Sequence, residues 1–490
     1  MWHTMNYVST RGQAPRVTAS QAILAGIAPD GGLYVPESWP TLDLDWSALQ
    51  NQTYSDIATQ VFDAFFDDFS VSEIDYVIQK AYGKQWATEN VVSLHDEENL
   101  TYIELFHGPT LAFKDVALQI LPHLMTTAAK KQSQNEKIVI LTATSGDTGT
   151  AAMSGFGNVD QTEIVVFYPE VGVSDVQRQQ MQTEAATNAH VIAITGNFDD
   201  AQKAVKSLLS DEKLIKELQQ HHQRFSSANS INIGRLVPQI VYYLYAYAQL
   251  IKKGTIQAGD AINITVPTGN FGNVLAAYYA SQIGLPVKEF IVASNENNVL
   301  TDFFETGTYD RDRAFKVTNA PAMDILVSSN LERLLYFVSG RNSEEVNQYM
   351  TSLANDGKYT LTSATRANLD KFTVGFATQT QVLETIRRVA QEENYIIDPH
   401  TAVGRYVYDQ LKPTGTTLLA ATASPYKFPQ TVLEALNQVP DTGKAGLKQL
   451  SDVTQTDIPA QVADLFAQPI LHKTIIDPEQ ISRTLRQEML

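Results

Sequence analysis

Short apolar runs alternate with longer amphipathic stretches through the middle of the chain. The runs are rich in Val and Ile, and their length suits strands that are buried on both faces. They cover residues 137–141, 163–167, 190–194, 261–266 and 289–293. Helical patterns lie between them, for example over 115–130 and 199–209. This order predicts an α/β fold with mainly parallel sheets covered by helices on both faces.

The two ends of the chain have different patterns. Before about residue 100, helices are expected over 54–67 and 72–82 in a mixed segment. After about residue 430 the chain is more polar, and 444–464 and 478–490 are expected to form helices at an edge or a tail. The most apolar stretch, 236–251, contains a proline and four tyrosines, which is typical of a buried helix rather than a membrane span.

Length and charge narrow the possible functions. At 490 residues the chain is too long for one ordinary core, so two or three domains are expected. The formal net charge of −18 argues against general binding to nucleic acid or acidic membranes, and an anionic substrate would need a local cluster of donors. The absence of cysteine excludes disulfides and thiolate metal sites. Residues 1–12 lack the apolar core of a signal peptide, so we expect a cytoplasmic protein.

Three segments carry residue types that suit one chemistry. In residues 106–115, Lys114 lies in an otherwise apolar, small-residue turn, and a lysine shielded from water can form a Schiff base with an aldehyde. Two glycine-containing turns, 143–150 and 267–273, can hold a carboxylate or a phosphate with backbone N–H groups. The aldehyde that carries a phosphate and needs a lysine is pyridoxal phosphate. Each segment alone also fits an ordinary helix start or a solvated lysine.

Together these segments resemble the threonine synthase family of pyridoxal-phosphate enzymes, which has the tryptophan-synthase-β type of fold. The matching stretches follow one another in family order at 7–12, 26–37, 106–115, 143–149, 229–235, 267–273, 398–404 and 421–428. The element Ala28-Pro-Asp-Gly-Gly-Leu33 separates this family from its dehydratase relatives. The resemblance implies an α/β protein of PLP fold type II, with two open, mainly parallel sheets flanked by helices and an extra N-terminal segment.

We expect four parts along the chain. Residues 1–98 would form an N-terminal domain, and 99–136 with 225–430 a large cofactor-binding α/β domain. Residues 137–224 would form a small α/β domain inserted in the large one, and 431–490 a C-terminal helical segment.

The resemblance also implies roles for individual residues. Lys114 is implied to be the Schiff-base lysine and the catalytic base. The cofactor would contact Gly269, Asn270, Phe271, Gly272 and Asn273 through its phosphate and Thr422 through its pyridine nitrogen. The substrate would contact Thr144, Ser145, Asp147 and Thr148 through its carboxylate, and Ser230, Asn232, Arg235 and Lys427 through its phosphate. One departure is Ser424-Pro-Tyr-Lys427, where the family often has His-Pro-Ala-Lys, so the surroundings of Lys427 stay open.

The activity implied is conversion of O-phospho-L-homoserine and water to L-threonine and phosphate, with pyridoxal phosphate as cofactor. No metal, nucleic acid or membrane is expected as a partner, and the protein would be a monomer or a homodimer. One alternative is dehydration of serine or threonine, or β-replacement, on the same fold; these substrates carry no phosphate and do not need Arg235. Another is a non-catalytic amino-acid-phosphate binding protein, although Lys114 is present. His107 and His400 are interpreted as structural hydrogen-bonding groups rather than bases.

Overall fold

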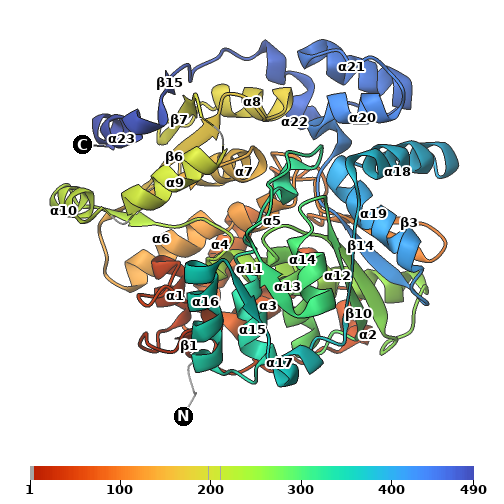
Figure 1. The fold of residues 1–490 in the computed structure, drawn as a ribbon, viewed down its shortest axis with the longest axis horizontal. Helices are drawn as coiled ribbons and strands as arrows, with labels where there is room; N and C mark the ends of the chain where they lie inside the picture. Colours follow the sequence, from red (N-terminus) through yellow and green to blue (C-terminus); the bar gives the residue numbers. More distant parts are fainter. Residues whose placement is uncertain (1–4, 197, 210, 490) are drawn as a thin grey trace.

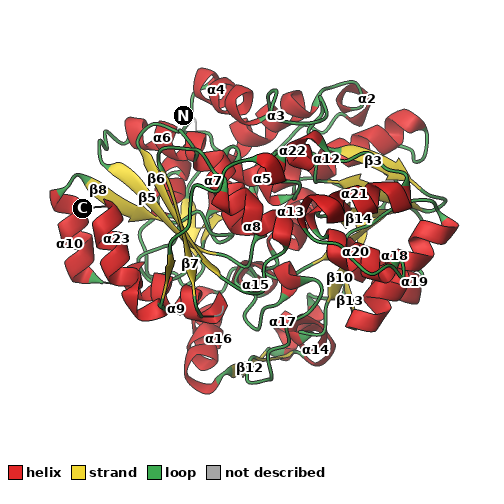
Figure 2. Ribbon diagram, turned by 90° about the horizontal axis from the view of Figure 1, so that it is seen from above, coloured by secondary structure: helices red, strands yellow, loops and turns green. Residues whose placement is uncertain are grey.

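A computed structural model of the protein describes residues 5–196, 198–209 and 211–489. Its main feature is a pair of sheets, each flanked by helices, that lie side by side (Figures 1 and 2). In Figure 2 the five-stranded sheet lies at the left and the six-stranded sheet at the right, with helices between them. The expected α/β class, with two mainly parallel sheets and an extra N-terminal segment, is confirmed.

The larger sheet has the strand order β13-β10-β9-β14-β4-β3. Its strands are parallel except at the edge, where β3 pairs antiparallel with β4. The strands are β3 (Ser93–Asp96), β4 (Leu100–Glu104), β9 (Ile262–Pro267), β10 (Val287–Ser294), β13 (Phe372–Phe376) and β14 (Thr417–Ala421). Helices that pack around this sheet include α12 (Pro238–Lys253), α13 (Gly272–Gln282), α14 (Val299–Thr306), α18 (Gln379–Glu392), α19 (Pro399–Leu411) and α20 (Pro429–Ala435).

The smaller sheet is parallel throughout and has the order β15-β7-β6-β5-β8. Its strands are β5 (Lys137–Ala143), β6 (Thr162–Pro169), β7 (Ala189–Ile194), β8 (Gln223–Ser226) and β15 (Ile475–Ile476). The helices of this half are α7 (Asp147–Phe156), α8 (Asp175–Gln182), α9 (Phe198–Leu209), α10 (Glu212–Gln220) and α23 (Ile481–Met489). The end of the chain therefore returns to the half built from residues 137–224.

The N-terminal segment packs on the large half. Its strands β1 (Tyr7–Ser9) and β2 (Tyr34–Pro36) pair antiparallel, and its helix α3 lies against the tyrosine-rich helix α12. Its helices are α1 (Ala19–Ala25), α2 (Trp46–Leu49), α3 (Tyr54–Phe65) and α4 (Val71–Ala81). The remaining elements are α11 (Ile233–Leu236), α15 (Leu331–Val338), α16 (Ser343–Asp356), α17 (Ser363–Ala367), α21 (Gly443–Thr454), α22 (Ala460–Ala463), the strand pair β11 (Thr308–Asp310) and β12 (Lys358–Thr360), and the 3₁₀ turns η1 (Pro321–Met323), η2 (Pro425–Lys427), η3 (Leu465–Ala467) and η4 (Pro478–Gln480).

Strands are found over all five of the apolar runs, and a buried helix over 236–251, as expected. The helix expected over 115–130 is wrong in one respect, because it is split into α5 (Lys114–Leu118) and α6 (Leu121–Lys131). Pro122 has no N–H to donate to the carbonyl of Leu118. That carbonyl lies against Gly155 of α7, where an added Cβ would come within 2.0 Å of its oxygen. The break therefore lets two helices approach closely behind Lys114.

Each sheet contains a strand from outside the residue range expected for its domain. Strand β3 belongs to the large sheet although it precedes residue 99, and β15 joins the small sheet from within 431–490. The division into four parts stays a prediction. Among the residues that the structure describes, no helix is long and apolar enough to cross a membrane.

Candidate active site

The turn that carries Lys114 is attached to the end of strand β14. Phe113 donates its N–H to the carbonyl of Thr422 (2.8 Å), and Ser424 donates its N–H to the carbonyl of Leu111 (3.0 Å). Within the turn, Asp115 accepts hydrogen bonds from the backbone N–H (2.8 Å) and the hydroxyl (2.6 Å) of Thr110. Lys114 and Thr422, which are far apart in the sequence, are therefore held side by side at the carboxyl end of a parallel strand, where such sheets bind ligands.

The ammonium group of Lys114 is almost shielded from water. Its side chain is 13% exposed, and its Nζ lies 3.7 Å from Oδ2 of Asp147. Burial lowers the pKa of Lys114 to about 8; the carboxylate of Asp147 raises it, and the positive charges of Arg235 and Lys427 lower it further. A substantial fraction of this amine is therefore neutral near pH 8, as a nucleophile or a base requires.

Asp147 lies between two lysines at the start of α7. Lys427 is fully buried, its Nζ lies 3.4 Å from Oδ1 of Asp147, and it donates to the carbonyl of Thr110 (2.6 Å) and the hydroxyl of Thr150 (3.2 Å). Burial alone would raise the pKa of Asp147, but Lys427 and Lys114 together hold it well below the ordinary value. The ammonium of Lys427 is thus directed at Asp147, so its predicted role at the substrate phosphate faces competition from this ion pair.

The turn before α7 presents free backbone N–H groups. The hydroxyl of Thr144 accepts hydrogen bonds from the N–H groups of Gly146 and Gly149, both at 2.9 Å, and so shapes the turn itself. In the described part of the chain, no acceptor is found for the N–H groups of Ser145, Asp147 and Thr148. Ser145 and Thr148 are half-buried. The turn is therefore suited to hold a carboxylate.

The Gly269–Asn273 loop leads from β9 into α13, with Phe271 in the left-handed conformation (φ 62°). Its carbonyls are bound from behind: Ser328 donates its hydroxyl to Gly269 (2.7 Å), and Asn330 donates its N–H (3.1 Å) and its Nδ2 (3.0 Å) to Asn270. With the carbonyls fixed on one side, the N–H groups of the loop can converge on the other. The roles of Ser328 and Asn330 could not be predicted from the sequence. They lie in a polar segment without a motif, and such residues are usually exposed at the surface.

Two features of this loop fit a phosphate group. The side-chain Nδ2 of Asn273 is buried and has no hydrogen-bond partner among the described residues, while its Oδ1 accepts from the hydroxyls of Tyr242 (2.6 Å) and Tyr243. A Cβ on Gly269 would lie 3.1 Å from the carbonyl oxygen of Ala322 and 3.2 Å from Cα of Met323. At Gly272 a Cβ would meet the protein only at 3.6 Å, so a side chain there would be limited by a bound group rather than by the fold.

Arg235 is a buried cation without an anion. It is 4% exposed and donates Nη1 to the carbonyl of Ala228 (3.0 Å), while its Nε has no acceptor. No carboxylate of the described residues forms an ion pair with it. Burial lowers its pKa to about 10. Such a group is suited to bind a phosphate.

Asn232 and Ser230, which are also predicted to bind the substrate phosphate, differ in whether their side chains already form hydrogen bonds. Asn232 is fully buried, and its Nδ2 donates to the carbonyls of Ile23 (3.0 Å) and Ser227 (2.9 Å) while its Oδ1 caps α11 at Gly234 (2.9 Å). These bonds favour a structural role for Asn232. Ser230 is half-buried and forms no side-chain hydrogen bond within the described ranges.

Thr422 and His400 lie near the end of β14. Thr422 is 6% exposed, and its N–H donates to the hydroxyl of Thr401 (3.2 Å). His400 Nδ1 is 2.6 Å from Asp398, and its Nε2 accepts the N–H of Ala322 (3.1 Å), so both ring nitrogens have structural partners. No cluster of metal-ligating side chains is found among the described residues.

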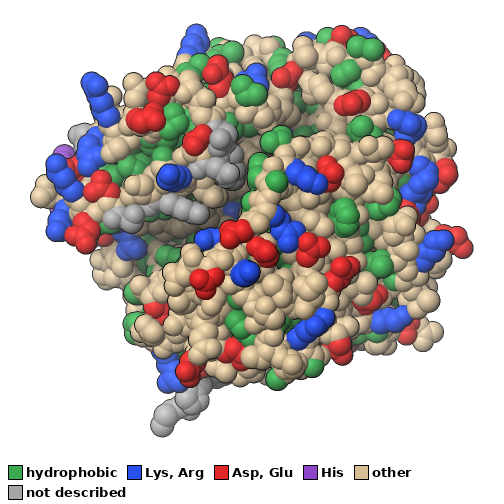
Figure 3. All heavy atoms as spheres, in the orientation of Figure 1, with side chains coloured by type: hydrophobic (Ala, Val, Ile, Leu, Met, Phe, Trp, Pro, Cys, Tyr) green, Lys and Arg blue, Asp and Glu red, His purple; other side chains and the backbone are tan. Residues whose placement is uncertain are grey.

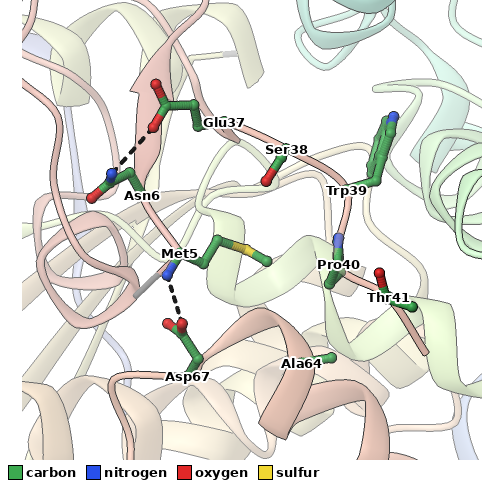
Figure 4. A pocket seen from close by; sticks show the side chains of 9 residues that line it. All are labelled: Met5, Asn6, Glu37, Ser38, Trp39, Pro40, Thr41, Ala64 and Asp67. Atoms are coloured by element: carbon green, nitrogen blue, oxygen red, sulfur yellow. Dashed lines mark hydrogen bonds between the residues drawn. The ribbon is translucent and has the colours of Figure 1, made fainter. Parts of the chain in front are cut away.

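A surface hollow lies away from these residues. It has a volume of about 610 Å³ and is lined by Met5, Asn6, Glu37, Ser38, Trp39, Pro40, Thr41, Ala64 and Asp67, none of which belongs to the predicted site (Figure 4). On the face drawn in Figure 3, acidic and basic side chains are interspersed. The cations of the candidate site, by contrast, are buried beneath the surface.

Comparisons with known proteins agree on one family. The model described as "Pyridoxal-phosphate dependent enzyme" matches residues 97–422, with "Threonine synthase N terminus" at 6–82 and "Threonine synthase, C-terminal" at 401–481. A threonine synthase of Pseudomonas aeruginosa is 39% identical over 474 residues, which is 94% of each chain. The crystal structure of pyridoxal-phosphate-bound threonine synthase from Brucella melitensis is 35% identical and covers 99% of both chains with a TM-score of 0.88.

A longer relative is also similar. Human threonine synthase-like 1 is 34% identical over 485 residues, which is 96% of this chain but only 63% of that relative. The matches with the family models nevertheless extend over the N-terminal segment, both sheets and the C-terminal segment. Lys114, the Gly269–Asn273 loop and Arg235 all lie within the residues matched, and the matches show that the chain belongs to the threonine synthase family of pyridoxal-phosphate-dependent enzymes.

Proposed function

We propose that the protein converts O-phospho-L-homoserine and water to L-threonine and phosphate. In this reaction the Cγ–O bond to phosphate breaks, the hydroxyl of water adds at Cβ, and protons are removed and returned at the neighbouring carbons. The proposal rests mainly on Arg235, a buried guanidinium with no carboxylate partner beside Lys114. A substrate phosphate is the group that this cation lacks.

The residues present fit pyridoxal phosphate. We propose that Lys114 anchors it covalently, that the Gly269–Asn273 loop and the unpaired Nδ2 of Asn273 hold its phosphate, and that Thr422 faces its ring nitrogen. The chemistry that the cofactor supplies is an aldehyde that reacts with amines and a ring that withdraws electrons from the α-carbon. A neutral hydroxyl at the ring nitrogen does not stabilise a full pyridinium charge as a carboxylate would.

Lys114 is proposed as the base that moves protons. When its amine is not bound to the cofactor, a pKa lowered to about 8 would leave part of it able to accept a proton near neutral pH. One flexible base close to Cα and Cβ can serve several steps. Asp147 and Lys427 form a buried ion pair behind this amine and help to set its charge.

The substrate would be held at its two charged ends. The free N–H groups of Ser145, Asp147 and Thr148 at the start of α7 are proposed to bind the carboxylate, with the hydroxyl of Thr144 shaping the turn. Arg235, with Ser230 beside it, is proposed to bind the phosphate. This pair of contacts requires both halves of the molecule, because the turn belongs to the small sheet and Arg235 to the segment that enters the large half.

The decisive experiment is release of inorganic phosphate from O-phospho-L-homoserine by purified protein, with threonine identified as the second product. Serine and threonine serve as comparison substrates. If dehydration of these amino acids were faster than phosphate release, the protein would be a dehydratase of the same family fold. If neither reaction occurred with cofactor bound, the binding-protein alternative would hold.

We further propose a cytoplasmic location and a monomer or homodimer in solution. Cell fractionation and light scattering test them directly.

A further inference from the structure

Among the residues that the structure describes, Arg333 is the largest side chain that is fully buried. It lies in α15, and three of its nitrogens donate hydrogen bonds: Nε to the carbonyl of Tyr34 (3.0 Å), Nη1 to Oδ1 of Asn330 (2.6 Å) and Nη2 to the carbonyl of Ile231 (2.5 Å). All three acceptors are uncharged. The carboxylate of Glu332 is close enough to act on Arg333 electrostatically, but its ion pair is with Arg11, and no carboxylate in the described part of the chain pairs directly with Arg333. A buried cation without a directly paired counter-ion is costly, so a function for its charge is expected.

The three acceptors come from three separate parts of the site. Tyr34 begins β2 and follows the Asp30-Gly-Gly-Leu element of the N-terminal segment. Ile231 lies between Ser230 and Arg235 in the segment proposed to bind the substrate phosphate. Asn330 is bound to the carbonyl of Asn270 by both its N–H and its Nδ2. One guanidinium therefore connects the N-terminal element, the substrate-phosphate segment and the cofactor-phosphate loop.

We propose that Arg333 is a positioning residue for two phosphate sites, fixing the Gly269–Asn273 loop and the Ile231–Arg235 segment relative to each other and adding a positive charge behind both. The part that concerns the substrate phosphate rests on the proposed function. The part that concerns the cofactor phosphate rests only on the Gly269–Asn273 loop and on membership of the chain in a pyridoxal-phosphate-dependent family.

The geometry explains why an arginine is needed here. A planar guanidinium can donate in three directions from one rigid group, whereas the single ammonium of a lysine cannot reach three acceptors held in a plane. Asn330 transmits the contact, because its Oδ1 is held by Arg333 while its Nδ2 holds Asn270. Its Nδ2 also lies 3.6 Å from the position of a Cβ on Gly272, directly behind the loop. Burial lowers the pKa of Arg333, yet the group stays charged at any physiological pH.

The test compares two probes that differ only in a phosphate. Equilibrium binding of pyridoxal phosphate and of pyridoxal is measured by absorbance on the cofactor-free full chain, for the wild type, R333M and R333K. R333M should weaken binding of pyridoxal phosphate by on the order of tenfold or more and leave binding of pyridoxal nearly unchanged. R333K keeps the positive charge but not the planar guanidinium, so its affinity for pyridoxal phosphate should lie between those of the wild type and R333M. Equal loss for both probes in R333M, or no loss for either, would overturn the proposal.

R341M is the matched control. Arg341 also donates to carbonyls of the N-terminal segment, at Pro36 and Glu37 (both 2.9 Å), but it does not contact Asn330 or Ile231. It should leave the ratio of the two affinities at the wild-type value. If R333M does not fold, N330A can be used, because it breaks the link to Asn270 and keeps the charge of Arg333. The same two probes are then compared. A selective loss of affinity for pyridoxal phosphate supports the proposal, and an unchanged ratio of the two affinities contradicts it.

The substrate part has its own readout. With cofactor saturating, R333M should raise KM for O-phospho-L-homoserine by on the order of tenfold and change kcat less, because binding rather than proton transfer is affected. A fall in kcat with KM unchanged would refute this part. The binding measurements involve no turnover, so a wild-type protein that released no phosphate would refute the proposed function and leave the cofactor-phosphate result to stand on its own.

Discussion

Replacing Arg235 by alanine removes the cation that is proposed to bind the substrate phosphate. The side chain is 4% exposed and has no anionic partner among the described residues, so its charge is available to a ligand. Charge-assisted hydrogen bonds contribute roughly 1.5–3 kcal/mol each, and a buried, weakly screened pair lies at the upper end. A loss of about 3 kcal/mol corresponds to a fall in kcat/KM for O-phospho-L-homoserine of on the order of a hundredfold.

The assay is continuous phosphate release, and the control is dehydration of serine, which carries no phosphate and should change little. R235M separates loss of charge from loss of volume, since it fills most of the same space. Arg235 also lowers the pKa of Lys114, so both variants should raise that pKa above about 8, seen as a shift of the pH dependence of cofactor binding to higher pH. Equal losses on both substrates, with no shift in the pH dependence, would show that Arg235 supports the fold rather than binds the phosphate.

Three other changes test separate parts of the site. K114A should lower turnover by several orders of magnitude, and borohydride reduction of the wild type should label the peptide that contains Lys114; a label on another lysine contradicts the assignment. G269V should lower Tm, since its Cβ would lie 3.1 Å from the carbonyl of Ala322, whereas G272A should keep Tm but weaken pyridoxal phosphate binding; the reverse order would refute our description of the loop. D147N should destabilise the protein by about 3–5 kcal/mol in denaturant unfolding, because the fully buried Lys427 loses its counter-ion, and an unchanged midpoint would show that this ion pair does not stabilise the fold. Because the folded pKa of Asp147 is depressed, its contribution is present above the ordinary carboxyl pKa of about 4 and is lost as pH falls below it, so D147N should differ least from wild type in acid.

The regular elements could be predicted because their signal is local. A run such as Val139–Leu141 is apolar throughout since both faces of its strand are covered, and periodicity reports that directly. The break between α5 and α6 and the strand β15 could not be predicted with the same ease. The break occurs at Pro122, which hydrophobic periodicity over 115–130 does not register, and the close helix contact that it allows depends on Gly155, a residue of another helix. Strand β15 is two residues long and forms only because β7 offers it a free edge.

The site divides in the same way. Lys114, Gly269 and Arg235 could be predicted as site residues because they lie in compact motifs whose residue types suit the proposed chemistry. Their mutual placement depends on contacts between distant segments, such as the bond from Phe113 to Thr422. The ion pair of Lys427 with Asp147 and the hydrogen bonds of Asn232 to nearby carbonyls could not be predicted from a motif. The type of a side chain does not specify its hydrogen-bond partners.

The burial of its cations would allow so acidic a protein to bind the two anions proposed here, the phosphates of cofactor and substrate. The net charge of −18 is carried mostly by exposed carboxylates, and at physiological salt such charges are screened beyond roughly 8 Å. A buried guanidinium acts through a medium of lower dielectric constant, where one charge at close range outweighs several on the surface. Lys427 does not contribute in this way because Asp147 pairs with it, whereas Arg235 and Arg333 form no ion pair with a carboxylate of the described residues. Phosphate recognition is therefore expected to depend on these two arginines and to respond little to changes of surface charge.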